Sequence, residues 1–174
     1  MNNLRIVITG GVGAGKTSFI RTISDIEVVD TDKKATDEIA NIKAQTTVDL
    51  DFGHLTITPN QLLYLYGTPG QTRFDFMWDI LIHRANAYIL LVAAHRPQHF
   101  HYSSEILDFI NQRVQIPMLI GLTHTDCPGA LGAEEIAIAL GVQNTLIVVN
   151  TTKKASVRAA LQALIQEITK TSKL

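Results

Sequence analysis

The chain has 174 residues, of which 46% are hydrophobic and 18% are charged, and its formal net charge is −1. These values are typical of one ordinary globular domain and exclude an intrinsically disordered chain. The near-neutral charge gives no electrostatic basis for binding nucleic acid or an anionic membrane surface. The single cysteine, Cys127, cannot form an internal disulfide, which suits the reducing cytoplasm.

The sequence contains no apolar run as long as a membrane span, so no transmembrane segment is expected. No glycine follows Met1 and no prenylation box closes the chain, so we expect neither common lipid anchor. The last three residues, Ser172-Lys173-Leu174, match the short peroxisomal address, but so simple a pattern also matches by chance. A cytoplasmic location is therefore expected.

Apolar runs alternate with helical patterns along the chain, without an internal repeat or a linker. This order predicts an α/β fold with a mostly parallel sheet, in one domain that spans residues 1–174. We expect strands at residues 4–9, 48–58, 62–66, 87–92, 118–122 and 145–149. We expect helices at residues 16–24, 74–83, 103–113, 133–140 and 155–170. A turn at Pro59-Asn60 should make the second and third strands an antiparallel hairpin.

The apolar patterns of the second strand and of the segment after residue 73 are irregular or open to two interpretations. In the second strand, apolar side chains occupy even positions up to Phe52 and odd positions from Leu55, so we expect a one-residue bulge near Gly53-His54. After residue 73, a helical stripe of large apolar side chains indicates either core or an exposed effector patch. That stripe consists of Phe74, Met77, Trp78 and Leu81.

Residues 10–17 match the P-loop pattern G-x-x-x-x-G-K-[ST], between a predicted strand and a predicted helix. Glycines let successive backbone N–H groups point at phosphates, and the helix N-terminus adds its dipole. We expect Lys16 to supply a charge for the β- and γ-phosphates and the Thr17 hydroxyl to be a ligand for Mg²⁺. The candidate phosphate-binding residues are Gly11, Val12, Gly13, Ala14, Gly15, Lys16, Thr17 and Ser18.

A candidate base-binding segment, Thr123-His124-Thr125-Asp126, follows the fifth predicted strand and resembles the N-K-x-D motif of GTPases. An Asp there accepts hydrogen bonds from N1–H and the N2 amine of guanine, whereas adenine offers an acceptor at N1 and no N2 amine. Asp126 therefore favours GTP, although it could also simply open a turn before Pro128. Thr151 and Thr152, after the last strand, are the candidate loop at the edge of the base.

Two further segments resemble the switch regions of Ras-like GTPases. Residues 65–71 resemble the D-x-x-G-Q segment, in which Gly70 would direct its N–H to the γ-phosphate and Gln71 would orient the attacking water. Thr47 resembles the first switch threonine, which closes over Mg²⁺, and it follows a long polar connection at roughly residues 26–46. The candidate catalytic groups are Gln71, Gly70 and Lys16, and the candidate Mg²⁺ ligands are Thr17 and Thr47.

The resemblance covers nearly the whole chain and is nearest to bacterial Ras-like GTPases of the MglA type, whose switch segment often reads G-T-P-G-Q. It implies a six-stranded sheet with helices on both faces and one antiparallel strand, with GTP or GDP and Mg²⁺ at the carboxyl ends of the strands. It also implies a protein effector and a Roadblock-type regulatory partner. The expected activity is slow GTP hydrolysis to GDP and phosphate.

The sequence departs from that family in three places. Gly67 stands where D-x-x-G has its aspartate, and Asp49, Asp51 or a carboxylate of the long connection could replace it. Thr123-His124 stands where the family has Asn-Lys, and His124 could stack on the guanine plane in place of that lysine. Val12 crowds the space that a partner's arginine would enter, so intrinsic hydrolysis should be slow, on the order of 10⁻⁴ to 10⁻³ per second.

Three functions fit these observations. The first is a GTP-operated switch that signals through its two switch segments, with hydrolysis aided by Gln71 or by an arginine of the chain itself, such as Arg73. The second is a P-loop kinase or ATPase, and the third is a GTP-binding scaffold that does not hydrolyse its ligand. The histidines at positions 95, 99 and 101 fit no standard zinc spacing, so we interpret them as part of a polar loop.

Overall fold

The computed structural model describes residues 3–28, 50–69, 76–144 and 146–171. Within these ranges six strands form one sheet in the order β2-β3-β1-β4-β5-β6. Its strands are β1 (Leu4–Gly10), β2 (Asp51–Thr58), β3 (Gln61–Gly67), β4 (Ala87–Ala93), β5 (Met118–Thr123) and β6 (Leu146–Val148). The β2–β3 hairpin is antiparallel and the other described pairs are parallel, which confirms the predicted sheet.

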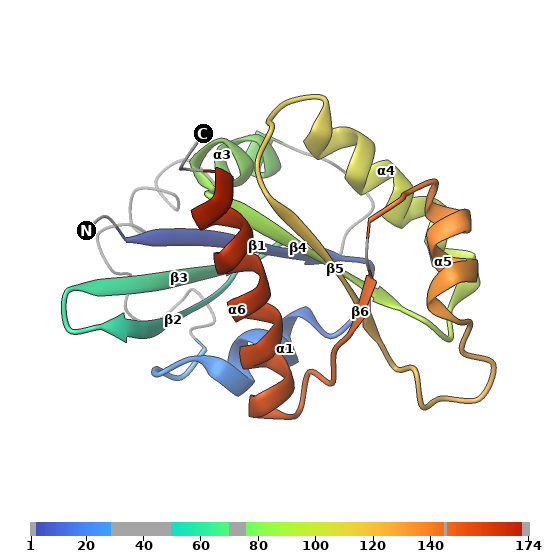
Figure 1. Ribbon diagram of the computed structural model, residues 1–174, viewed down its shortest axis with the longest axis horizontal. Coiled ribbons are helices and arrows are strands. Elements are labelled where there is room, and N and C mark those ends of the chain that lie inside the picture. The colour runs from blue at the N-terminus through green and yellow to red at the C-terminus, as the bar shows by residue number, and fades with distance from the viewer. Residues whose placement is uncertain (1–2, 29–49, 70–75, 145, 172–174) are drawn as a thin grey trace.

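The helices cover both faces of this sheet (Figure 1). They are α1 (Lys16–Ile23), α3 (Phe76–Arg84), α4 (Phe100–Asn111), α5 (Ala133–Leu140) and α6 (Lys154–Thr171), with a 3-10 turn, η1 (Pro97–His99), before α4. Helices α1 and α6 pack on one face, and α3, α4 and α5 pack on the other. Since β1 and β4 are covered on both faces, residues 6–8 of β1 and the whole of β4 are continuously apolar rather than alternating.

The predicted bulge at Gly53-His54 is wrong. Strand β2 pairs with β3 in one continuous register from Asp51 to Thr56, and the irregular step lies next to the turn, between Thr56 and Thr58. The change of parity has another cause, because Phe52 packs with the α3–α5 core and Leu55 packs against the α1–α6 core. Gly53 lies where α1 comes close, since a Cβ there would be 2.7 Å from Ile20 Cγ2.

The apolar stripe of α3 belongs to the core. Met77, Trp78 and Leu81 are all buried against the sheet, which confirms the core interpretation for these three residues. Phe74 lies outside the described residues. None of the helices in the described part of the chain combines the length and the hydrophobicity that crossing a membrane requires.

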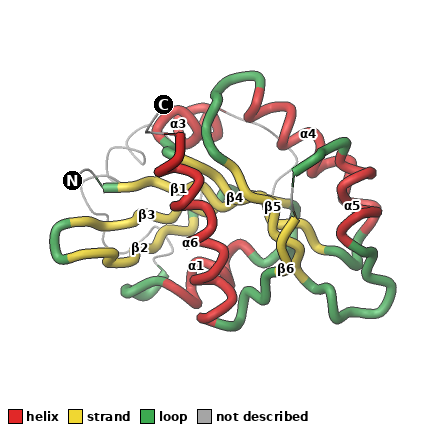
Figure 2. Tube along the Cα trace, in the orientation of Figure 1, coloured by secondary structure: helices red, strands yellow, loops and turns green. Residues whose placement is uncertain are grey.

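The parallel strands bring three loops to one edge of the sheet. The loops follow β1, β5 and β6, and the carboxyl ends of parallel strands meet at the same edge. Figure 2 shows these loops, in green, on the lower right side of the sheet. The candidate phosphate-binding and base-binding segments are therefore neighbours in space.

Candidate nucleotide-binding site

The loop after β1 has the backbone conformation of an anion-binding loop. Gly10 and Gly15 both have positive φ, 144° and 102°, which side chains rarely adopt. A Cβ at Gly10 would also lie 2.3 Å from the carbonyl oxygen of Leu91, so no larger residue fits there. Gly15 is the N-cap of α1, and it directs the first turn of that helix into the loop.

Lys16 is enclosed by this loop, with 8% of its surface exposed. Its Nζ donates hydrogen bonds to the carbonyl oxygens of Gly10, at 2.7 Å, and Gly11, at 2.8 Å. Burial lowers the pKa of Lys16 from 10.5 to about 8, and the nearby carboxylate of Asp51 opposes the shift. The free protein thus holds a cation that lacks a full counter-charge, at the place where phosphates are expected to bind.

This pKa predicts that triphosphate affinity falls as the pH rises above about 8. Phosphates bind the protonated lysine, so above the pKa of the free protein Lys16 has to take up a proton when the ligand binds. Each pH unit should then cost about tenfold in affinity, while affinity below pH 8 should be flat. Titration with a fluorescent nucleotide from pH 6.5 to 9 would measure this change.

Calorimetry in two buffers of different ionisation enthalpy should show proton uptake on binding above pH 8. A nucleoside monophosphate is the control, because it lacks the β- and γ-phosphates that Lys16 would bind. Its pH dependence also shows any contribution from titration of the base. Equal pH dependence of monophosphate and triphosphate binding would contradict the role of Lys16.

Next to Lys16, the hydroxyl of Thr17 donates a hydrogen bond to Asp51 Oδ2 at 2.5 Å. Asp51 begins β2, so the second strand brings a carboxylate to the phosphate end of the site. Both groups offer oxygen atoms, the ligands that Mg²⁺ prefers. The other predicted metal and catalytic groups, Thr47, Gly70 and Gln71, lie outside the described residues.

Two adjoining cavities run from the P-loop to the base-binding segment. The first, of about 330 Å³, is lined by Gly13, Gly15, Lys16, Thr17, Ser18, His124, Thr151 and Thr152. The second, of about 360 Å³, is lined by Thr123, His124, Thr125, Asp126, Val148, Val149, Asn150, Thr151 and Thr152. Because they share His124, Thr151 and Thr152, they form one groove with a phosphate end and a base end.

Thr123 joins the two ends of this groove. Its side chain is 1% exposed, and its hydroxyl donates to the carbonyl oxygen of Ala14 at 2.8 Å. The base-binding segment is thereby fixed to the P-loop. Asp126, three residues later, is exposed at the wall of the base cavity, where its carboxylate can accept hydrogen bonds from a ligand.

His124 lies where the two cavities meet, in a left-handed conformation with φ of 56°. Its Nδ1 is 3.0 Å from Thr123 Oγ1, and its ring centroid is 4.9 Å from that of His95. Burial lowers the pKa of His124, and His95 and Arg96 lower it further, whereas Asp126 opposes the shift. The lowered pKa favours the neutral form of the imidazole, whose flat ring can contact a base or a sugar without adding charge.

The loop after β6 closes the other wall. The carbonyl oxygen of Thr151 accepts a hydrogen bond from Thr22 Oγ1 at 2.6 Å, which fixes this loop to α1. Asn150 Oδ1 accepts from both N–H and hydroxyl of Thr152, at 3.0 and 2.7 Å, and so shapes a tight turn. The structure thus places Thr151 and Thr152 in the groove, as predicted, while leaving their role as nucleotide ligands untested.

Arg96 and His95 come from the loop after β4, and neither was predicted to lie at the site, since His95 was interpreted as part of a polar loop. Arg96 Nη1 donates to the carbonyl oxygen of Val12 at 3.2 Å, and a Cβ at Gly13 would lie 2.6 Å from the same nitrogen. The guanidinium therefore packs directly on the P-loop. No motif marks these residues, and only their place after a buried strand could have indicated them. Among the described residues, no three His, Cys, Asp or Glu side chains form a metal cluster.

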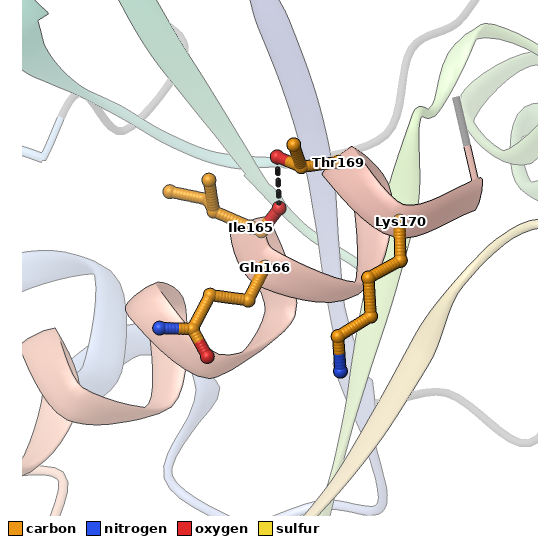
Figure 3. Close-up of a pocket in the computed structure, with 4 residues that line it drawn as sticks. All are labelled: Ile165, Gln166, Thr169 and Lys170. Atoms are coloured by element: carbon orange, nitrogen blue, oxygen red, sulfur yellow. Dashed lines mark hydrogen bonds between the residues drawn. The ribbon is translucent and has the colours of Figure 1, made fainter. Parts of the chain in front are cut away.

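A second hollow, on α6, lacks the features of a ligand site (Figure 3). It is lined by Ile165, Gln166, Thr169 and Lys170, and the hydroxyl of Thr169 donates back to the carbonyl of Ile165 at 2.9 Å. Lys170 is 2.7 Å from Glu167, so its charge has a partner. This hollow lies in the last turns of α6, whereas the groove lies before its first turn.

Comparison with known proteins agrees with a nucleotide-binding site. Residues 26–174 match the family described as "Conserved hypothetical ATP binding protein", a range that begins after the P-loop. An uncharacterized protein of Methanocaldococcus jannaschii, MJ1339, is 27% identical over 126 residues, which are 72% of each chain.

Among solved structures, the Arl6 (BBS3) small GTPase from Trypanosoma brucei, with the bound nucleotide analogue GppNp, has a TM-score of 0.73 to this chain. The likeness covers 98% of this chain and 99% of that one, at 15% sequence identity. At this identity it shows the fold alone. The chain therefore belongs to the family described as conserved hypothetical ATP binding proteins, and it has the fold of Ras-like small GTPases.

Proposed function

We propose that this chain binds GTP and GDP and works as a molecular switch with slow intrinsic hydrolysis. One observation supports this most: a single groove has Lys16 at its phosphate end and the carboxylate of Asp126 at its base end. A carboxylate at the base end is complementary to the two donors on the edge of guanine. Adenine would face the same carboxylate with an acceptor nitrogen, which would repel it.

ATP is the second candidate, because the description of the matched family says ATP. Competition against a bound fluorescent guanine nucleotide separates the two. GTP and GDP should displace the probe at concentrations about 10²-fold or more below the concentration of ATP that does so. This ratio follows because guanine gains two charged hydrogen bonds, worth roughly 1.5–3 kcal/mol each. Equal displacement by ATP and GTP would refute guanine selectivity.

Mg²⁺ is proposed as the cofactor, and the side chains at the phosphate end fit it. Thr17 and Asp51 present adjacent oxygen atoms, and Thr47 is proposed to supply a third. When bound, Mg²⁺ would neutralise negative charge on the β- and γ-phosphates. The chain's own contribution is to hold the phosphates against Lys16 and the N-terminus of α1.

For hydrolysis, the resemblance to Ras-like GTPases assigns Gln71 to the attacking water and Gly70 to the γ-phosphate. Val12 is 62% exposed at the P-loop, in the region that a partner's arginine would enter, and Arg96 of the same chain lies beside it. We therefore expect slow turnover without a partner's arginine. Single-turnover rates of the wild type and of Gln71→Ala test this assignment, and equal rates would remove Gln71 from the mechanism.

The assignment to the MglA type, the cytoplasmic location, a protein effector and a Roadblock-type regulator remain part of this proposal. The MglA type and the two partners rest on the resemblance of residues 65–71 to the switch segment of that group. The cytoplasmic location rests on the single cysteine, Cys127, which suits a reducing compartment. Co-purification with protein loaded with a non-hydrolysable GTP analogue, compared with GDP-loaded protein, tests the partners. Hydrolysis that stays undetectable with every co-purified partner would instead favour a scaffold that does not hydrolyse GTP.

A further inference from the structure

Asp51 and Gly67 face each other across two neighbouring strands. Strands β2 and β3 are antiparallel, and Asp51 is the register partner of Gly67. Gly67 is the position where the sequence lacks the expected aspartate of D-x-x-G. The carboxylate on the adjacent strand therefore lies directly opposite the residue that has none.

The two positions cannot both carry a side chain without rearrangement. A Cβ added to Gly67 would lie 2.9 Å from Asp51 Cβ, 3.3 Å from its Oδ2 and 3.0 Å from Ile20 Cδ1. The backbone of Gly67 is outside the left-handed region, so conformation alone does not require glycine there. Glycine at position 67 instead makes the space that the side chain of Asp51 occupies.

The carboxylate of Asp51 points toward the phosphate end of the groove. Its Oδ2 accepts the hydrogen bond from Thr17, whose hydroxyl is the predicted Mg²⁺ ligand. Its charge also acts on Lys16, the other phosphate-binding side chain. Asp51 is thus close to both polar side chains of the P-loop.

We propose that Asp51 replaces the aspartate missing at position 67, so that β2 instead of β3 supplies the carboxylate of the Mg²⁺ site. This inference rests on the proposed function, since the metal would arrive with the nucleotide. Mg²⁺ usually binds through one or two protein oxygen groups plus substrate phosphates and waters. That mode fits a site where the described residues show no cluster of three metal-binding side chains.

The test is the Mg²⁺ dependence of nucleotide release. Release of a fluorescent nucleotide from the full chain is followed over free Mg²⁺ concentrations set with EDTA. Asp51→Asn, which keeps the shape of the side chain, should raise the Mg²⁺ concentration for half-maximal retention by about 10- to 100-fold. Release in excess EDTA should stay close to that of the wild type, because the phosphate contacts of the P-loop are unchanged.

The double variant Asp51→Gly with Gly67→Asp is the most informative test. It moves the carboxylate to β3 and removes the clash with the side chain of Asp51. Its nucleotide release should therefore recover a large part of the Mg²⁺ dependence of the wild type. Asp108→Asn, an exposed aspartate on α4, is the matched control and should behave as the wild type. Thermal unfolding of the free variants checks that each one is folded.

Three results would overturn the inference. The first is an unchanged Mg²⁺ response in Asp51→Asn. The second is faster nucleotide release from Asp51→Asn by the same factor with and without Mg²⁺, which would mean that Asp51 only supports the P-loop. The third is a wild type that releases its nucleotide at the same rate with and without Mg²⁺. Failure of the proposed function looks different: the wild type would then bind no guanine nucleotide, and the same assay would be run with a fluorescent adenine nucleotide.

Discussion

Replacing Lys16 with methionine is expected to weaken triphosphate binding by about 10²-fold or more and, at the same time, to stabilise the nucleotide-free protein. The loss of affinity follows from removing charged hydrogen bonds to phosphate, worth roughly 1.5–3 kcal/mol each. The gain in stability follows from the lowered pKa of Lys16, about 8 in the free protein. At pH 7 folding buries a protonated lysine at a cost of roughly 3 kcal/mol, from 1.36 kcal/mol per pKa unit.

Part of the stability gained by Lys16→Met is offset by lost hydrogen bonds. The carbonyl oxygens of Gly10 and Gly11 lose their Lys16 donor, although Gly11 still accepts from Ala14 at 3.2 Å. Methionine retains most of the apolar stem, so no large cavity forms. We therefore expect the free energy of unfolding to rise by about 1 to 2 kcal/mol at pH 7.

Urea denaturation of both free proteins measures this difference, and its pH dependence gives a second check. A lysine with a folded pKa of about 8 and an unfolded pKa near 10.5 destabilises the fold below pH 8. The free energy of unfolding of the wild type should therefore rise between pH 8 and 10.5. The difference in that free energy between Lys16→Met and the wild type should shrink over the same range. A variant that is less stable than the wild type at pH 7 would show that Lys16 contributes to folding. Arg21→Met, on the same helix, is the control.

The motif-bearing parts of the site were predictable because their chemistry is local in sequence. The P-loop needs particular residues at fixed spacing between a strand and a helix, and the structure has that context at residues 10–17. Thr123 ends β5, and residues 124–126 and 151–152 follow strands of a parallel sheet, so the fold alone brings them to the same edge. Helix and strand positions were predictable to within a few residues for the same reason.

Contacts that depend on register and close packing could not be predicted. Asp51 was one of several carboxylates that could replace the aspartate missing at Gly67, and only the β2–β3 register places it opposite that glycine. Arg96 reaches the P-loop from a loop 84 positions away in the sequence. The predicted bulge at Gly53 was wrong for a similar reason. This glycine makes room for helix α1, and strand β2 continues through it without interruption.

Asp126→Asn is expected to convert guanine selectivity into selectivity for xanthine. The wild-type carboxylate accepts from N1–H and from the N2 amine of guanine, whereas an asparagine offers one acceptor and one donor. Xanthine keeps N1–H and carries a carbonyl at C2, so it matches the asparagine. GTP affinity should fall by about 10²- to 10⁴-fold, from the loss of two charged hydrogen bonds, and affinity for xanthosine triphosphate should rise.

The fold should tolerate this change, because Asp126 is exposed in the free protein and surface substitutions usually alter stability by about 0.5 kcal/mol or less. Competition titrations with the triphosphates of guanosine, xanthosine and adenosine measure the change, with Glu134→Gln, an exposed residue on α5, as the charge-matched control. The result also decides between the two candidate ligands. If ATP is the ligand and Asp126 only opens a turn, the substitution should leave the ranking of the three nucleotides unchanged. A reversal of the affinities for GTP and xanthosine triphosphate requires the Asp126 carboxylate to contact the base. The two ligands carry the same phosphates, so a change in folding or in phosphate binding would affect both equally.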